Sequence, residues 1–445
     1  MKRFIVVSCA MIILLILTGT SQSQNNLRWR SVPTIPNTVN LRYEDLSFIN
    51  AKTGWVIISY SSGSQSVNDV FRTKDGGVSW AKFTDTSFGG LRSIGFADSL
   101  HGWLGTLKWP GTVMYRTVNG GENWEKVITS SLVDSLGVCG ISVVSKDIVY
   151  GCGRYYGPAR FFKTTNGGVN WTVKNLNPYI TTLIDCHFFN KDSGFVVGGI
   201  GSTFGNRSGA ILFTSDGGET WVNRATTPPR GQWCWKISFP DRMNGYVSLE
   251  KNSGSPVYFY KTTNGGETWE EKTFLNTVAD EEGIGFINAN TGWLGGWFFN
   301  TYKTTDGGNT WNSDPWGYNL NRIRVISDTL AYGAGARIYK FSRDSIVGLT
   351  QISSIVPDDF ELKQNYPNPF NPNTIINYKL KRQSDVVLSV HDIVGRQVSE
   401  LVNSRQSAGT YEVTFSAANL SSGVYSYSLH VDGAVVASRR MAVVK

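Results

Sequence analysis

Six copies of one eight-residue motif recur at nearly equal intervals in this chain of 445 residues. Each copy reads Thr-x-(Asp/Asn)-Gly-Gly-x-x-Trp, and the copies span 73–80, 117–124, 164–171, 214–221, 262–269 and 304–311. Successive tryptophans of the motif are 44, 47, 50, 48 and 42 residues apart. A turn motif with an aromatic residue at this period is typical of four-stranded propeller blades.

A second repeat alternates with the first and consists of two short apolar segments joined by a polar turn. The first segments are 46–48, 94–96, 141–143, 187–189, 237–239, 284–286 and 323–325. The second segments are 54–56, 102–104, 148–150, 194–196, 245–247, 292–294 and 330–332. The sequence contains seven inner hairpins but only six intact motifs, so one blade lacks an outer strand of its own.

The missing strand has a candidate at the other end of the same region. Residues 338–344 predict a third strand that runs into a degraded motif, and 27–32 resemble the strands that follow the motif tryptophans, such as 124–127. We expect 27–32 to pair into the last blade and to close a seven-bladed ring, which protects the edges between blades. The alternative is an open array in which the two ends do not meet.

The motif is best explained as a device for building a turn. The side-chain oxygen at its third position can accept backbone N–H groups, its glycines allow backbone angles closed to other residues, and its tryptophan offers apolar surface for packing. Three of the six copies carry Asn, so hydrogen bonding and not charge is what the turn requires. We therefore expect a structural role, and neither metal binding nor catalysis, for the third residue of each copy. These residues are Asp75, Asn119, Asn166, Asp216, Asn264 and Asp306.

The repeated motifs resemble the Asp-box (BNR) repeats of sialidases, sortilin-type receptors and several glycoside hydrolases. The tandem array also resembles the propellers of the photosystem II assembly and stability factor family. The resemblance covers 26–345 and implies that the boxes lie on outer turns, away from the ligand face.

The N-terminal segment predicts export from the cytoplasm. Two basic residues precede an apolar run from Phe4 to Leu17, which is short for a bilayer span, so 1–23 is interpreted as a signal peptide. An N-terminal membrane anchor is the alternative, and no later stretch is long and apolar enough to span a membrane. The net charge of +8 is spread thinly and gives no nucleic-acid stripe.

Four cysteines follow the predicted signal peptide, and no two of them have CxxC spacing. We therefore expect no metal site and no cofactor. Cys139 and Cys152 are placed to form a disulfide across one hairpin; four buried free thiols, with Cys186 and Cys234, are the alternative.

After an expected linker at 346–358, residues 359–445 predict a second, small domain. Prolines at 367, 369 and 372 exclude a helix at its start, and alternating strands at 375–380, 386–391, 409–415, 424–431 and 434–444 predict an antiparallel β-sandwich with an Ig-like fold.

This segment closely resembles the type A sorting domain of type IX secretion. The resemblance lies in Asn-Tyr-Pro-Asn-Pro-Phe-Asn-Pro at 365–372, Asp-Ile-Val-Gly-Arg at 392–396, Leu-Ser-Ser-Gly-Val-Tyr at 420–425 and the terminal strand at 440–445. One departure is Phe-Ser-Ala at 415–417, where relatives often have Trp-Asp. The resemblance implies the type IX machinery as a partner, and a protein released or anchored at the outer cell surface.

The loop-rich face of the closed ring is the expected functional site. It gathers aromatic and basic side chains that suit sugars or peptides, because ring faces stack on apolar groups while the rim hydrogen-bonds. These ligand-binding candidates are Tyr43, Arg92, Trp109, Tyr155, Tyr156, Trp233, Trp235, Trp297 and Arg322. For each of them, packing between blades is the competing explanation.

Catalysis is the weaker alternative for the same face. Hydrolysis of a glycosidic bond requires two carboxyl groups about 5–10 Å apart. The candidates are Glu44, Asp185, Glu281 and Glu282. Three functions remain in order of preference: a secreted or surface-displayed binding module for a glycan, peptide or surface protein, an extracellular glycoside hydrolase, and an assembly scaffold.

Overall fold

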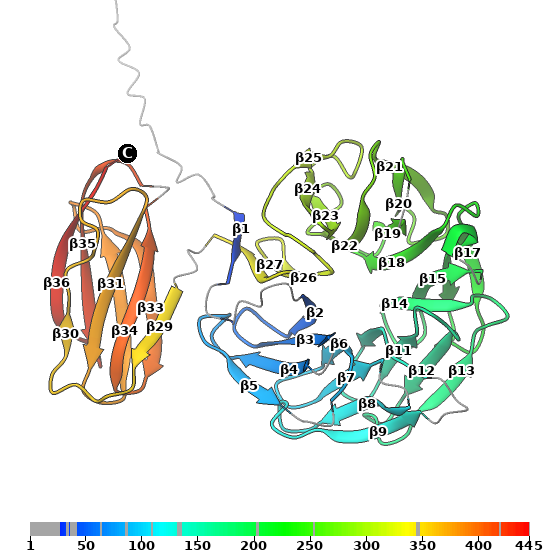
Figure 1. Ribbon diagram of the computed structural model, residues 1–445, viewed down its shortest axis with the longest axis horizontal. Helices are drawn as coiled ribbons and strands as arrows, with labels where there is room; N and C mark the ends of the chain where they lie inside the picture. Colours follow the sequence, from blue (N-terminus) through cyan, green and yellow to red (C-terminus); the bar gives the residue numbers. More distant parts are fainter. Residues whose placement is uncertain are drawn as a thin grey trace, which may run out of the picture.

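The computed structural model describes residues 27–32, 35, 42–62, 65–84, 88–107, 110–130, 136–201, 204–251, 254–343, 348–417 and 420–444. The expected signal peptide at 1–23 and the candidate Trp109 lie outside this part of the chain. Within it, strands form nine four-stranded sheets, and a 3-10 turn, η1 (Phe204–Asn206), is the one helical element. Seven sheets stand around a ring and two form a sandwich (Figure 1). The predicted all-β class, a propeller followed by a sandwich, is confirmed.

The blades are numbered by their innermost strands. These are β2 (Tyr43–Phe48), β6 (Leu91–Phe96), β10 (Gly140–Val143), β14 (Thr182–Phe188), β18 (Gln232–Ser238), β22 (Asp280–Phe286) and β26 (Arg322–Ser327). The second strands are β3 (Gly54–Ser62), β7 (Gly102–Thr106), β11 (Val149–Gly153), β15 (Gly194–Ile200), β19 (Gly245–Lys251), β23 (Gly292–Trp297) and β27 (Leu330–Ala334). The third strands are β4 (Gln65–Thr73), β8 (Gly111–Thr117), β12 (Arg160–Thr164), β16 (Ser208–Thr214), β20 (Val257–Thr262), β24 (Phe299–Thr304) and β28 (Ile338–Ser342).

The outermost strands show how the ring closes. Blades 1 to 6 end with β5 (Ala81–Thr84), β9 (Glu125–Ser130), β13 (Thr172–Asn175), β17 (Val222–Thr226), β21 (Glu270–Leu275) and β25 (Asn312–Ser313). In blade 7 this place belongs to β1 (Arg28–Ser31), which pairs antiparallel with β28 from Arg28 opposite Ser342 to Ser31 opposite Tyr339. Figure 1 shows this N-terminal strand at the edge of the last blade, whose strands β26 and β27 are labelled. The prediction that 27–32 complete the ring is confirmed, and the open array is excluded.

Each motif copy folds into the same hydrogen-bonded turn between the third and fourth strands of blades 1 to 6. In the first copy, Thr73 Oγ1 accepts the Gly77 N–H at 2.9 Å and donates to Asp75 Oδ1 at 2.8 Å, and Asp75 Oδ1 accepts the Ser79 N–H at 2.9 Å. Gly76 and Gly77 have φ values of 74° and 97°, which only glycine adopts without strain. The Asn copies make the same bonds, as at Asn119, so the turn requires an acceptor oxygen and no charge.

Adjacent blades are joined by stacked aromatic rings. Trp55 of blade 1 stacks on Phe96 of blade 2 at 3.5 Å, and Tyr332 of blade 7 stacks on Phe48 of blade 1 at 3.6 Å. Gly54 makes room for this arrangement, because a Cβ there would lie 2.3 Å from the Phe48 ring. The aromatic residue and the glycine of the second repeat are thus needed for packing between blades.

Cys139, Cys152, Cys186 and Cys234 are all buried and free. Cys139 and Cys152 lie on one hairpin, where the Cys139 N–H donates to the Cys152 carbonyl at 2.7 Å, yet they form no disulfide. The structure therefore agrees with the free-thiol alternative.

The second domain packs two sheets around one apolar core. One sheet has the order β29 (Gly348–Ser353), β34 (Gly409–Ser416), β31 (Asn373–Leu380) and β30 (Glu361–Leu362). The other has the order β33 (Gln397–Gln406), β32 (Ser384–His391), β35 (Gly423–Val431) and β36 (Ala434–Val443).

Two features of this domain differ from the sequence expectation. β29 lies within the expected linker 346–358 and pairs with β34, so this sheet begins earlier in the chain than predicted. β33 was missed because its exposed side carries polar residues that resemble a loop. Among the described residues, no helix has the length and hydrophobicity needed to cross a membrane.

Candidate functional site

The antiparallel blades give the propeller two distinct faces. The turns between first and second strands lie on one face, called here the box face. The turns of the six motif copies, called here the box turns, lie on the same face. The loops between second and third strands and the connections between blades lie on the other, called the loop face. The first strands stand around the axis of the ring (Figure 1). The region around this axis, where side chains of opposite blades meet, is called here the channel.

β-Bulges turn charged side chains of the first strands into the channel. The pairing of first and second strands shifts at Glu44, Arg92, Ile184, Trp235–Lys236 and Glu282. An extra residue in one strand breaks the alternation of side chains, so that two consecutive residues can face the same side. Residues such as Glu44 and Asp45 can therefore both reach partners across the channel.

The loop-face end of the channel is crossed by a chain of ion pairs. Arg42 donates to Glu282 and, at 3.3 Å, to Glu44, while Arg92 also donates to Glu44. The Arg42 guanidinium lies 4.0 Å above the Trp297 ring, whose N–H donates to Glu282 at 2.9 Å. The chain links blades 1, 2 and 6 and engages two of the four candidate carboxylates, Glu44 and Glu282.

A second group of ion pairs lies one residue further along the strands. Arg322 donates to both oxygens of Asp185, at 2.5 and 3.0 Å, and to Asp45 at 3.0 Å. All three side chains are buried, and they tie blades 1, 4 and 7 together. Lys236 lies in the same region with 1% exposure, and its ammonium group has no hydrogen-bond partner among the described residues.

Electrostatics divide the four candidate carboxyl groups into two kinds. Burial alone would raise the pKa of Glu44 and Asp185, but Arg42 and Arg92 lower the pKa of Glu44, and Arg322 lowers that of Asp185 to about 2. Burial raises the pKa of Glu282 despite Arg42. Burial also raises the pKa of Glu281 well above its usual value, and neither of its carboxyl oxygens has a partner among the described residues.

Exposed aromatic residues gather on the loop face. Tyr156 is 58% exposed and packs against Tyr155, with ring centroids 3.8 Å apart and ring planes inclined by 39°. Phe298, at the tip of the β23–β24 turn beside Trp297, is 73% exposed and has a φ of 62°. Its N–H donates to Asn319 Oδ1 at 2.9 Å, which holds this unfavourable backbone conformation in place. Tyr318 is also exposed.

Burial removes several predicted ligand-binding residues from the accessible face. Tyr43 is completely buried among the apolar residues between blades 7 and 1, so its prediction as a ligand contact is wrong. Trp233 and Trp235 are buried, and Trp235 donates to Asn321 at 3.1 Å. Arg322 is buried in its ion pairs. Tyr155, Tyr156 and Trp297 remain at the surface, and Arg92 lies beneath Tyr155 at 5.8 Å.

Several channel residues were not predicted from the sequence. They are Arg42, Asp45, Lys236, Asn321 and Arg324. Their signal is positional: Asp45, Lys236 and Arg322 each directly precede an apolar residue, at 46, 237 and 323, that begins an inner segment of the second repeat. Aligning the seven inner strands on that apolar residue would have found Asp45 and Lys236, but not Arg42, Asn321 or Arg324.

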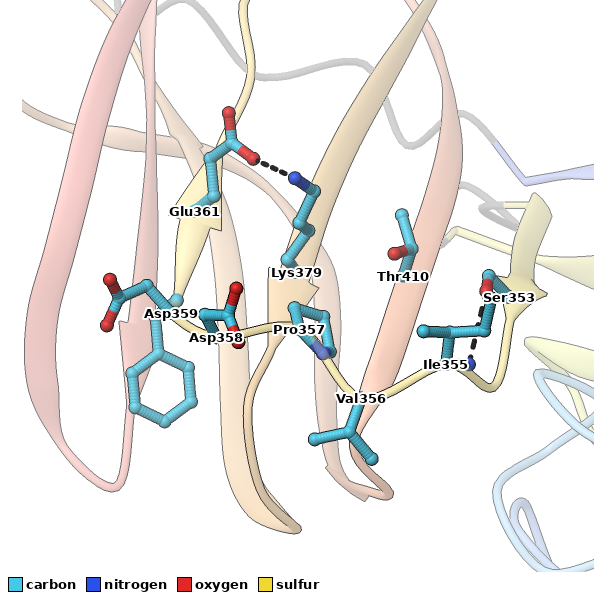
Figure 2. A pocket seen from close by; sticks show the side chains of 10 residues that line it. Ser353, Ile355, Val356, Pro357, Asp358, Asp359, Glu361, Lys379 and Thr410 are labelled. Atoms are coloured by element: carbon cyan, nitrogen blue, oxygen red, sulfur yellow. Dashed lines mark hydrogen bonds and ion pairs between the residues drawn. The ribbon is translucent and has the colours of Figure 1, made fainter.

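The sandwich domain carries an open groove of about 560 Å³, which is separate from the channel. Residues 354–360 cross from the β29 edge of the sheet to the β30 edge, and the groove lies along this crossing (Figure 2). Figure 2 shows the ion pair between Glu361 and Lys379, at 2.7 Å, on one side of it.

Comparison with known proteins assigns the C-terminal part and the fold of the rest. Residues 364–443 match the family described as the secretion system C-terminal sorting domain. The predicted resemblance is confirmed, and the domain marks the protein for export through type IX secretion to the cell surface or the extracellular space. No curated protein matches the chain.

Solved structures share the propeller fold at low sequence identity. A YCF48 bound to D1 peptide is 19% identical, with a TM-score of 0.51, over 71% of this chain and 96% of that one. YCF48 from Cyanidioschyzon merolae is 20% identical, with a TM-score of 0.51, over 71% and 98%. A GH74 xyloglucanase from Xanthomonas campestris is 13% identical, with a TM-score of 0.51, over 86% and 63%. At these identities the comparisons establish the fold alone.

Proposed function

We propose that this protein is a surface-displayed or secreted binding module whose loop face takes a glycan, a peptide or a surface protein as its ligand. One observation carries the proposal: three of the four candidate carboxylates already bind arginine or tryptophan side chains across the channel. The arginines lower the pKa of Glu44 and Asp185, and this weakens their basicity and nucleophilicity, because a positive neighbour stabilises the charged form. The loop face instead offers exposed rings beside arginines.

The exposed rings give this face a chemistry suited to binding. Tyr156 and Phe298 are exposed and Trp297 is partly exposed, while the Arg42 guanidinium lies against the Trp297 ring and Arg92 lies near the Tyr155 ring. Stacking on a sugar or a peptide side chain excludes water from such rings, and nearby polar groups fix the orientation. The strained Phe298 backbone supports a selected role for its position, because strain of this kind is concentrated at functional sites.

The proposal is tested by binding and turnover measured on the same protein. The full chain is applied to arrays of glycans and peptides and to a panel of fluorogenic glycosides. Binding to an array without hydrolysis is expected. Replacing Tyr156 and Phe298 by alanine should weaken binding at least tenfold, while Met243→Ala, an exposed apolar residue on the box face, should leave it unchanged. Equal losses in both variants would contradict the loop-face assignment.

One observation favours a glycoside hydrolase as the second candidate. Glu281 has the raised pKa of a general acid, and burial with Glu250 and Asp280 nearby is its cause. Hydrolysis of a glycoside that disappears in Glu281→Gln or Glu282→Gln would establish this function and overturn the first. If neither activity nor array binding is found, the assembly scaffold gains support.

A further inference from the structure

The box-face mouth of the channel contains a cavity that lies apart from the loop face. It has a volume of about 250 Å³ and is formed by blades 1, 2, 3, 4 and 7. Its polar side chains are Ser47, Ser142, His187 and Arg324, and none of the residues that line it is acidic. The rest of its lining is apolar or glycine, so a polar ligand would be held by these four residues.

Arg324 is incompletely paired. Among the described residues its one ion pair is with Asp45 Oδ1, at 3.6 Å, and the same oxygen accepts the shorter bond of 3.0 Å from Arg322. Arg322 also occupies both oxygens of Asp185. Burial and the neighbouring Arg322 lower the pKa of Arg324, whereas bound carboxylates raise that of Arg322. The Arg324 guanidinium therefore still has donors to offer.

The other polar groups of the cavity are hydrogen-bond donors. Ser47 Oγ accepts the Phe96 N–H at 3.1 Å, and Ser142 Oγ accepts the Phe188 N–H at 2.9 Å, which leaves each hydroxyl hydrogen for another acceptor. His187 is half-buried, and the loss of hydration there lowers its pKa to about 4. Its imidazole is therefore neutral at pH 7 and carries one N–H donor.

We propose that the box-face mouth of the channel binds a small oxyanion, of the carboxylate or phosphate class, on the Arg324 guanidinium, with Ser47, Ser142 and His187 as further donors. The planar fork of a guanidinium matches two oxygens of such an anion. The site does not depend on the proposed ligand of the loop face, since the ion pairs of Arg42, Arg92 and Arg322 separate the two ends of the channel.

The test uses sodium acetate and sodium phosphate as probes on the full chain, with sodium chloride at equal ionic strength as the control. Isothermal titration calorimetry measures binding, and NMR follows the imidazole signal of His187, one of four histidines. We expect at least one oxyanion to bind and to raise the pKa of His187. Acetate alone would identify the carboxylate class, and phosphate alone the phosphate class.

Arg324→Gln should weaken binding at least tenfold. The matched control is Lys191→Gln, because Lys191 is an exposed cation on the same face that pairs with Asp192 at 2.9 Å and does not line the cavity. An equal loss in the control would overturn the proposal, and so would the absence of binding by both probes. If Arg324→Gln does not fold, the His187 signal of the unmodified protein decides, because an unmoved signal would also overturn the proposal.

Discussion

Removing the indole of Trp29 should destabilise the propeller more than any surface change, because this residue fastens the N-terminal strand into the ring. Trp29 is 7% exposed, stacks on Trp316 at 3.8 Å and meets Trp293 edge-on at 5.4 Å. Both partners belong to blade 6 or to its connection with blade 7, while the strand of Trp29 pairs with β28 of blade 7. One side chain therefore joins the last two blades.

The magnitude follows from burial. Truncating a buried tryptophan to alanine costs about 3–5 kcal/mol. The Trp29 indole N–H has no hydrogen-bond partner among the described residues, so the loss comes from packing alone. Trp29→Phe keeps an aromatic ring over Trp316 and should cost about 1–2 kcal/mol. Val222→Ala, at an exposed position of β17, should change the unfolding free energy by about 0.5 kcal/mol or less.

Equilibrium unfolding in urea, followed by tryptophan fluorescence and by circular dichroism, measures these differences. The order Trp29→Ala, Trp29→Phe, Val222→Ala, from largest to smallest loss, is the expected result. A Trp29→Ala variant as stable as Val222→Ala would show that the packing of Trp29 does not stabilise the closed ring.

Three further predictions follow from the contacts described above. Asp185 has a pKa of about 2 in the folded protein, below the value of about 3.9 in an unfolded chain. Its ionised form therefore stabilises the folded protein above pH 4. We expect the free energy of unfolding to fall by about 2 kcal/mol from this group as the pH falls toward 2. Unfolding free energies measured from pH 5 to 2 should fall less steeply in Asp185→Asn, and parallel curves would contradict the ion pair with Arg322. Thr214→Val removes the acceptor of the buried Gly218 N–H and should lower the free energy of unfolding in urea by about 1–3 kcal/mol. An unchanged midpoint would show that the turn does not need the Thr214 hydroxyl. Deleting 348–445 should leave the protein in the periplasm when fractions are probed by immunoblot, and unchanged surface export would argue against the sorting domain.

The propeller was predictable because its repeats are local. Each of the six motif turns and seven inner hairpins is formed by residues that are close together in the sequence. The strand at 27–32 was predicted from its similarity to the strands that follow the motif tryptophans. β29 was harder to find, because its pairing with β34 joins segments about 60 residues apart and leaves no local signal. β33 was missed for a different reason, since one face of an antiparallel sheet can be polar throughout.

The site was predictable as a set of charged and aromatic residues but not as a set of contacts. Arg322 lies 277 residues from Asp45 and 137 residues from Asp185, and they meet because the ring brings blades 1, 4 and 7 around one channel. Tyr43 was misplaced because alternation predicts the direction of a side chain only where a strand has no bulge. Its strand has one at Glu44, so Tyr43 points into the core.

The segments that a bound ligand protects from exchange locate the binding surface of the propeller. Hydrogen–deuterium exchange is measured on the full chain with and without a glycan or peptide selected from the arrays. Slower exchange is expected in the loop-face segments 154–159, 296–299 and 315–320, with unchanged exchange in the six box turns. Protection confined to the box turns, or to the sandwich domain, would contradict a loop-face binding module.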